Sequence, residues 1–307
     1  MLRKFILTTA LLPSIAWAVT DIECYHIDRC RTRGTSYANP STGGRVRINP
    51  AAVPTSKGLG IEGIYFDQEV DLSIVRGNGR VGAAISPSNS EETFFGPPGF
   101  ELPEDYLDRK VEGSKYHGQK VTVATAFDVL NKKADMFNSY SFKVGAMGRY
   151  NKVTHNAYAG GGASGSFGPL IFGGSIYNDE TQLDYSIYGS TQQPSLKYQV
   201  RTYNVGLFLN SLIVDYSKLE VNATDISTVT ILTASLSISK CLLTASKRIE
   251  NALRPGYNYK TKTLTEDRVK EEYFGGIQYN LNENIMVGVL YNYYLQREFD
   301  ASLTLFF

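Results

Sequence analysis

From residue 59 onward, apolar and polar residues alternate with a period of two in a succession of short segments. The clearest examples are the segments 121–129, 142–150, 203–210, 232–239 and 285–293. One side of each segment is aliphatic with aromatic residues near the ends, and the other side is small, polar or charged. Successive side chains of a β-strand point to opposite faces, so a period of two indicates strands that separate two environments. The pattern predicts an all-β protein.

The segments and their connections predict a count of about fourteen strands, with twelve as the alternative because the first hairpin is the weakest. The predicted strands lie near residues 59–67, 69–77, 80–88, 120–130, 137–150, 156–168, 169–178, 200–210, 212–221, 227–239, 242–254, 270–281, 284–295 and 298–307. Short connections alternate with longer ones, and the longest of these are 88–119, 179–199 and 254–268. Bacterial outer-membrane barrels have short periplasmic turns and longer external loops. We therefore expect the short connections to lie in the periplasm and segments 88–119 and 254–269 to lie outside the cell.

The alternation alone does not distinguish an outer-membrane barrel from a soluble β-sandwich, which buries its apolar side. Three features favour the barrel: an export signal, charged residues set among glycines and serines on the polar side, and a last strand that ends on Phe307. In a barrel, the apolar side faces lipid and the polar side faces the lumen. We predict a transmembrane antiparallel β-barrel over residues 59–307, placed in the bacterial outer membrane with its lipid as a partner.

The last segment, EFDASLTLFF, places Phe299, Leu303 and Phe307 on one side and Ser302 and Thr304 on the other. We expect this strand to close the barrel against the first one. A terminal aromatic residue in this position resembles the sorting signal that the outer-membrane assembly machinery reads. Phe307 is therefore the predicted assembly signal, and that machinery is a predicted partner.

The N-terminal segment MLRKFILTTALLPSIAWA has the features of a secretory signal peptide over residues 1–18. Arg3 and Lys4 precede an apolar run, and Ala16-Trp17-Ala18 is a small-x-small cleavage site. An uncleaved membrane anchor is the alternative, which the shortness of the run and Pro13 disfavour. We predict export through a cleaved signal peptide.

Composition supports an aromatic-rich β protein and excludes a nucleic-acid partner. The 307 residues include 28 Gly, 21 Tyr and 15 Phe, against one Trp and three His. Tyrosines near strand ends suit the membrane interface, where an apolar ring and a wet hydroxyl are both satisfied. The formal net charge is +1, so no excess of basic residues is available for a polyanion.

Three cysteines are present, and two of them lie close together before the first strand. Cys24 and Cys30 are candidates for a disulfide in an oxidising compartment. A metal site that includes His26 is the weaker interpretation, since two Cys and one His lack a fourth ligand. Cys241 is expected to be an unpaired thiol. We predict no metal and no cofactor.

Residues 19–58 do not alternate and are rich in Gly, Pro, Ser, Thr and Arg. They end in Asn49-Pro50-Ala51-Ala52, which the first strand-like stretch, LGIEGIYF, closely follows. This arrangement resembles the long-chain fatty-acid transporter family of outer-membrane proteins. The resemblance implies that residues 19–58 form a plug inside a 14-stranded barrel, with Asn49, Pro50 and Ala51 as its motif. The alternative is a simple turn before a strand.

Charged residues on the polar side of the segments are candidates for the lumen. They include Asp128, Lys143, Arg149, Asp215 and Glu272. We expect them to form a network across the interior or with arginines of segment 19–58, because an unpaired charge in a narrow interior is costly. The alternative is a role in ion preference, which the nearly balanced charge does not favour.

An enzymatic barrel would need a nucleophile and a base near its outer rim. His155 with Ser164 and Ser166 is the nearest arrangement, but the sequence around Ser164 lacks the last glycine of a G-x-S-x-G motif. We predict that the protein is not an enzyme. The leading hypothesis is passive transport of hydrophobic, fatty-acid-like molecules across the outer membrane, with such a molecule as ligand. The alternatives are a general diffusion porin and a structural or surface-recognition barrel without transport.

Overall fold

The computed structural model describes residues 49–66, 69–88, 120–132, 137–152, 154–182, 195–209, 211–222, 226–258, 263–292 and 299–307. They form fourteen strands and one 3₁₀ helix, η3 (Pro50–Ala52). The first seven strands are β1 (Gly58–Phe66), β2 (Glu69–Gly77), β3 (Val81–Ser88), β4 (Lys120–Lys132), β5 (Tyr140–Asn151), β6 (Ala157–Phe167) and β7 (Leu170–Gln182). The last seven are β8 (Ser195–Leu209), β9 (Leu212–Asn222), β10 (Ile226–Ile238), β11 (Cys241–Asn258), β12 (Thr263–Asn282), β13 (Ile285–Asn292) and β14 (Phe299–Phe306). The predicted signal peptide, Cys24 and Cys30 lie outside the described residues.

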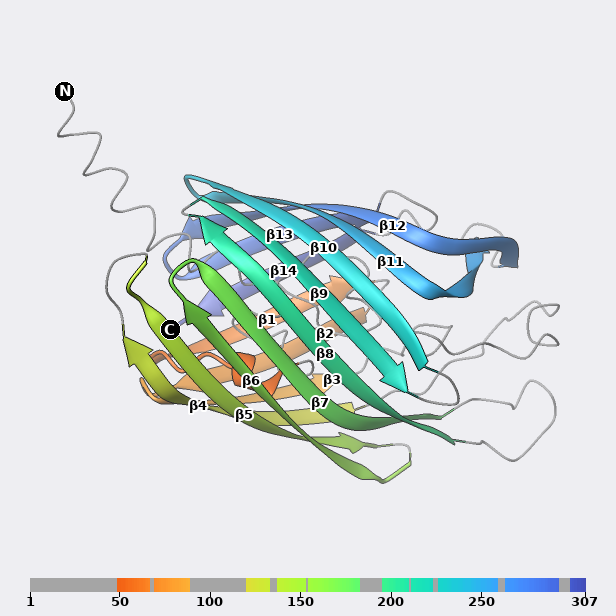
Figure 1. The fold of residues 1–307 in the computed structure, drawn as a ribbon, viewed down its shortest axis with the longest axis horizontal. Helices are drawn as coiled ribbons and strands as arrows, with labels where there is room; N and C mark the ends of the chain where they lie inside the picture. The colour runs from red at the N-terminus through yellow and green to blue at the C-terminus, as the bar shows by residue number, and fades with distance from the viewer. Residues whose placement is uncertain are drawn as a thin grey trace.

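The strands form one closed antiparallel barrel, in which each strand pairs with its neighbour in the chain and β14 pairs with β1 (Figure 1). The closing pair begins with Gly60 opposite Phe306. It is extended by two backbone hydrogen bonds, from Leu59 N–H to the carbonyl of Phe307 at 3.0 Å and from Phe307 N–H to that of Leu59 at 2.8 Å. The predicted all-β barrel and its count of fourteen strands are confirmed.

The outer face of the barrel is apolar, as the alternation predicts. On β4, Val123 and Phe127 are 49% and 48% exposed. Their neighbours Thr122 and Ala124, which point to the other face, are buried. A water-soluble protein does not cover its surface with large apolar side chains in alternate positions of successive strands. An outer-membrane barrel does, because lipid surrounds it. The fold is therefore that of a bacterial outer-membrane β-barrel.

On β5, the height of the apolar band equals the thickness of the hydrocarbon region of an outer membrane. Tyr140 and Tyr150 mark its two ends on the outward face, and no charged side chain lies between them on that face of this fully described strand. At about 3.3 Å per residue and a tilt of about 40°, the two tyrosines are separated by roughly 25 Å along the barrel axis. That distance matches the apolar band of outer-membrane barrels, with aromatic residues at both interfaces.

The connections at one end of the barrel are short, and this end is called the short-turn end below. Its turns include residues 78–80, 168–169, 239–240 and 283–284. Gly168 has a φ of +56°, a left-handed conformation that glycine adopts without a steric penalty. The opposite end, which contains the connection between β3 and β4, is called the long-loop end. β1 begins and β14 ends at the short-turn end.

The wall between β2 and β3 has an interrupted ladder. These two strands share four residue pairs, whereas β3 and β4 share eight. Pro87 lies in β3 and has no backbone N–H to donate. Beyond the ladder the contact is made by side chains, with Ser73 Oγ donating to Ser86 Oγ at 3.2 Å and Ser86 Oγ donating to the Leu72 carbonyl at 3.4 Å. This stretch is called the β2–β3 seam.

The predicted bounds 254–268 of one loop are wrong. β11 continues to Asn258 and β12 begins at Thr263, so most of this segment is strand. The two strands stay paired through register shifts on either side of Arg254 and Pro255. The proline and the charged residues resemble a loop in sequence, but a hairpin accommodates them because β-bulges absorb the misfit. Similarly, the predicted loop 179–199 is shorter, because β7 extends to Gln182 and β8 begins at Ser195.

Among the residues that the structure describes, no helix is both long and apolar enough to cross a membrane.

Candidate functional site

Residues 49–57 lie against the inner face of the wall and are called the docked segment. Asn49 caps η3 from an extended conformation, and its Oδ1 accepts the Ala51 N–H at 3.0 Å. Pro50 occupies the first helical position, where its missing N–H costs nothing. The Asn-Pro-Ala sequence therefore encodes one tight helical turn.

Polar contacts attach this turn to β6, on the side of the wall that faces the lumen. Asn49 Nδ2 donates to the Ala163 carbonyl at 3.2 Å, and Ser164 Oγ donates to the Ala51 carbonyl at 3.3 Å. η3 also lies against β4 and β5. Asn49, Pro50 and Ala51 are all buried. The turn formed by residues 49–52 thus lies against the inner face of the wall, and the rest of the predicted plug, residues 19–48, lies outside the described residues.

Glycines in the wall make room for the docked segment. A side-chain carbon added at Gly145 on β5 would overlap the backbone of Ala51, and one added at Gly162 on β6 would overlap the Asn49 amide. Gly77 and Gly82 similarly lie under residues 54–56. Close approach of two backbones requires glycine at such positions. These four glycines are therefore part of the docking surface.

Thr55 attaches the docked segment to a charged pair in the short-turn half of the lumen. Its hydroxyl donates to Asp128 Oδ2 at 2.8 Å, and Lys143 Nζ lies 3.6 Å from Asp128 Oδ1. Asn131 Nδ2 also donates to Asp128 Oδ2, at 3.3 Å. Asp128 and Lys143 were both predicted to face the lumen, and the structure brings them together across β4 and β5.

A second charged group, called the interior charge cluster, lies toward the long-loop end. Asp179 Oδ1 lies 3.1 Å from Lys120 Nζ, and its other oxygen pairs with Arg149. Tyr198 donates its hydroxyl to Asp179 at 3.2 Å, and the Arg149 guanidinium lies 4.9 Å from the centre of the Tyr177 ring. The three charged side chains are buried, so the attraction between them is little screened by water. The cluster holds two positive groups and one negative group.

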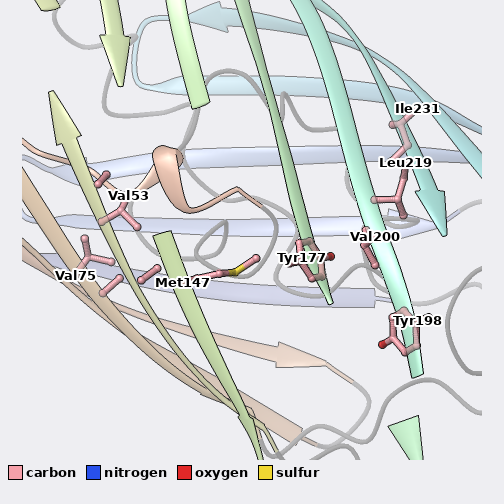
Figure 2. Packing of buried hydrophobic residues seen from close by; sticks show 11 residues of the cluster. Val53, Val75, Met147, Tyr177, Tyr198, Val200, Leu219 and Ile231 are labelled. Atoms are coloured by element: carbon pink, nitrogen blue, oxygen red, sulfur yellow. The ribbon is translucent and has the colours of Figure 1, made fainter. Parts of the chain in front are cut away.

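The same half of the lumen has an apolar wall, because the polarity of three strands inverts. Toward the short-turn end, most apolar residues of β8 to β10 face outward, as Val205 and Val214 do, although Ile213 faces inward. Toward the long-loop end, Val200, Leu219 and Ile231 face inward and are buried. These inward residues belong to a group of buried apolar side chains that also includes Val53, Met147 and Tyr177. Figure 2 shows this group on the inner side of the strands.

The remaining predicted lumen residues are dispersed around the barrel. Asp215 on β9 is buried and accepts a hydrogen bond from Ser217 at 3.3 Å. Glu272 lies opposite Arg248 in the β11–β12 ladder, but its side chain lies outside the described part of the structure. The partner arginines predicted in segment 19–47 are also outside it. Phe307 is exposed on the outer face, at the short-turn end.

The residues weighed as a hydrolase set are not brought together. His155 Nδ1 lies 3.0 Å from the Tyr150 hydroxyl, in the β5–β6 connection. Ser164 is seven residues beyond Ala157 on β6, or about 23 Å along the strand at 3.3 Å per residue. Within the described residues, no group of three or more His, Cys, Asp or Glu side chains is arranged to hold a metal ion. Cys241 is half-buried and is not in a disulfide.

Sequence reasoning missed Lys120, Asp179 and the inward apolar residues of β9 and β10. Lys120 and Asp179 are far apart in the chain, so only the barrel's closure and register reveal their pairing. Leu219 did carry a signal, because it lies between Lys218 and Glu220. A single apolar residue between two charges indicates that the charged side of the strand meets water.

No protein-family model and no curated protein matches the chain. Among solved structures it is similar to the CymD monoaromatic hydrocarbon channel, at a TM-score of 0.43 and 11% identity, covering 86% of this chain and 91% of that chain. It is also similar to the Pseudomonas putida toluene transporter TodX, at a TM-score of 0.41 and 11% identity, covering 93% and 97%. A mutant porin of Rhodopseudomonas blastica gives a TM-score of 0.40 and 10% identity, covering 81% and 98%. At these TM-scores the similarities carry no argument about function.

Proposed function

We propose that the protein transports hydrophobic small molecules passively across the outer membrane, and that its solutes are fatty-acid-like. The main support for this proposal is the inversion of polarity on β8 to β10, where the apolar side of the strands changes from the outer to the inner face. Val200, Leu219 and Ile231 give the lumen an apolar wall toward the long-loop end, where a water-filled pore would have polar side chains. Binding of an apolar solute to such a surface removes apolar area from water. The free energy of this transfer is favourable by about 25 cal/mol per Å² of apolar area covered.

The interior charge cluster supports a solute with one anionic group. Lys120 and Arg149 are two positive groups that share one carboxylate, Asp179, while the next carboxylate, Glu180, accepts hydrogen bonds from neutral side chains. Tyr177 and Val200 are members of the same buried apolar group as Val53, which belongs to the docked segment. A molecule with an apolar chain and a carboxylate would place its chain on the apolar wall and its carboxylate near the two basic side chains. That is the chemistry of a fatty acid.

The docked segment and the β2–β3 seam support a sideways route out of the lumen. Residues 49–57 occupy the inner face of the wall from β2 to β7 toward the short-turn end, which obstructs a straight path. The seam is the place where side-chain hydrogen bonds replace the ladder. The side-chain hydrogen bonds of the seam can break while the backbone ladder between the two strands stays intact. We propose that the solute leaves through the seam into the lipid.

A transfer assay tests the apolar wall. The wild-type protein in liposomes should accelerate transfer of a long-chain fatty acid and should conduct few ions in a planar bilayer. Leu219→Asn puts an amide in the apolar wall and should lower the transfer rate at least fivefold. Ser237→Asn, a polar replacement on the inner face of β10, is the control and should change it less than twofold.

Two outcomes would contradict the proposal. A large, stable ion conductance of the wild-type protein would identify a general diffusion porin. Neither conductance nor transfer, from the wild type or from a variant lacking residues 19–56, would identify a structural or surface-recognition barrel.

A disulfide across the seam tests the exit. Ser73→Cys with Ser86→Cys replaces two hydroxyls whose oxygens lie 3.2 Å apart, a distance that a disulfide can bridge after a small adjustment. Oxidation should lower fatty-acid transfer, and a reductant should restore it. The matched control is Ser235→Cys with Thr244→Cys, whose oxygens lie 3.0 Å apart in the continuous ladder of β10 and β11. Equal transfer by oxidised and reduced seam variants would rule out this exit while leaving transport itself intact.

A further inference from the structure

The outer face of β8 to β12 carries a group of basic side chains near the long-loop end, called the basic outer patch. Its described members are Lys197, Arg201, Lys218 and Lys247. Each lies on the outward side of its strand, as the burial of inward neighbours such as Tyr198 and Leu219 shows. The patch lies over β8, β9 and β11, whereas the outward face of β5 is uncharged from Tyr140 to Tyr150. The gathering of four basic side chains on nearby strands points to a contact with an anionic partner.

Tyrosines place the patch at the depth of the membrane interface. Tyr203 lies directly opposite Lys218 in the β8–β9 ladder, and Tyr273 lies opposite Lys247 in the β11–β12 ladder. Both tyrosines are exposed on the outer face, and Lys247 Nζ lies 5.4 Å from the centre of the Tyr273 ring. Tyrosine marks the boundary between the hydrocarbon and the headgroups. The basic groups therefore meet lipid headgroups.

The patch has an excess of positive charge. Lys218 Nζ pairs with Glu220 and Lys247 Nζ pairs with Glu271, both at 2.8 Å. These two partly exposed acids offset two of the four basic side chains. Glu180, which lies opposite Lys197 in the ladder, is buried, and its Oε2 accepts hydrogen bonds from the β5–β6 region. The outward surface thus keeps two net positive charges among its described side chains.

The guanidinium of Arg201 is the strongest phosphate ligand in the patch. Gln199 accepts a hydrogen bond from Arg201 Nε at 3.0 Å, which fixes the plane of the group. Arg201 is exposed and lies opposite Glu220, two residue pairs from Lys218. A guanidinium binds phosphate oxygens through two parallel N–H bonds, and a nearby lysine adds a point charge. On the side of the patch toward the short-turn end, Val205 and Val214 provide an outward apolar surface for acyl chains.

We propose that the basic outer patch binds the phosphate groups of a phosphorylated glycolipid of the outer leaflet, whose acyl chains lie on the apolar rows below. A second copy of this chain is the less suitable occupant. A symmetric contact would place the positive patch against itself, and like charges repel. The proposal depends on the long-loop end facing outward and is independent of what the lumen transports.

Binding to a bis-phosphorylated lipid A tests the proposal on the full-length protein in detergent. Native mass spectrometry or a titration should show binding at least tenfold tighter than to the same lipid A with both phosphates removed. The double variant Arg201→Gln with Lys218→Gln should lose that tenfold preference. Lys132→Gln is the matched control, because Lys132 lies 5.7 Å from the Tyr140 ring centre at the short-turn end. It should bind like the wild type.

Equal affinity of the wild type for the two lipid A forms would overturn the proposal, and this comparison needs no variant. Unchanged binding by a folded double variant would also overturn it. A dimer that appears without lipid and disappears in the double variant would assign the patch to a second copy. Tighter binding to phosphatidylglycerol vesicles than to lipid A would assign it to the inner-leaflet type of phospholipid.

Discussion

At the scale of single residues, glycine decides where the docked segment can lie. Gly145 and Gly162 are on the inner face, where an added methyl would overlap the backbone of Ala51 and the side chain of Asn49. Gly148 is on the outer face of the same strand as Gly145, and an added methyl there would meet nothing within 4 Å. Two glycines three residues apart therefore have different roles.

Gly145→Ala should release the docked segment. Overpacking costs about 1–3 kcal/mol, which shifts the ratio of docked to undocked protein by roughly 5- to 150-fold. We expect ion conductance in planar bilayers to rise by a comparable factor from the low value of the wild type. Gly148→Ala should conduct like the wild type. Identical traces from the two folded variants would show that the segment does not occlude the lumen.

Asn49→Ala should weaken the same docking by a different cause. The substitution removes the acceptor for the Ala51 N–H and the donor to the Ala163 carbonyl, at a cost of about 1–2 kcal/mol. Asn49→Asp keeps the acceptor and loses the donor, so its effect should be smaller. Limited proteolysis near the short-turn end measures the docked fraction. A cleavage rate that is the same for all three proteins would contradict the capping role.

At the scale of strands, the polarity of a segment reports which solvent each face meets. On β8 and β9 most aliphatic residues near the short-turn end, such as Leu207 and Val214, face lipid, whereas Val200 and Leu219 near the long-loop end face the lumen. Lys218 and Glu220 pair with each other on the outer side. The inversion means that the part of this wall near the long-loop end lies beyond the hydrocarbon of the membrane. Its outer face meets headgroups and water there.

The orientation of the strands predicts a labelling pattern. Lys152→Cys lies in the exposed connection between β5 and β6 at the long-loop end, and Lys240→Cys lies in the exposed turn between β10 and β11 at the short-turn end. A membrane-impermeant maleimide should label the first in intact cells and the second only after lysis. The reverse pattern would invert the topology and remove the basis for an outer-leaflet ligand.

The alternation in sequence predicted most strand positions to within a few residues, because lipid and lumen impose different chemistry on the two faces of each strand. It failed at Arg254 and Pro255, where the β11–β12 hairpin carries charges and a proline that are typical of loops. It also failed to assign Leu219 to the lumen, because a period of two does not say which side is inner. The pairing of Lys120 with Asp179 depends on register, which the sequence does not state.

At the scale of the whole molecule, closure depends on one pair of strands. β1 and β14 meet along their length, and backbone bonds between Leu59 and Phe307 extend the contact at the short-turn end. A barrel without this pair would expose two unpaired edges. The residues at this junction therefore affect the assembly of every other strand.

Phe307→Ser should reduce the amount of assembled barrel in the outer membrane several-fold, because we propose that Phe307 is read by the assembly machinery. Phe167→Ser is the matched control. The two phenylalanines are 69% and 67% exposed, and both lie at the short-turn end, but Phe167 is not at the closing junction. Heat-modifiable mobility on gels measures folded barrel in membrane fractions. An equal loss in both variants would indicate a general need for aromatic residues at the interface instead.

The position of the docked segment also has a consequence for the order of events during folding. Its contacts are with β2 to β7, and the separation along the chain between Asn49 and Ala163 is 114 residues. Closure joins Gly60 to Phe306, a loop about twice as long, and each doubling of loop length raises the entropic cost by roughly 0.6 kcal/mol. We therefore expect the segment to settle onto a half-built, still open sheet, and the later strands to enclose it. The protein would then acquire its obstruction before it acquires its pore, so that an ion-leaky intermediate never forms in the membrane.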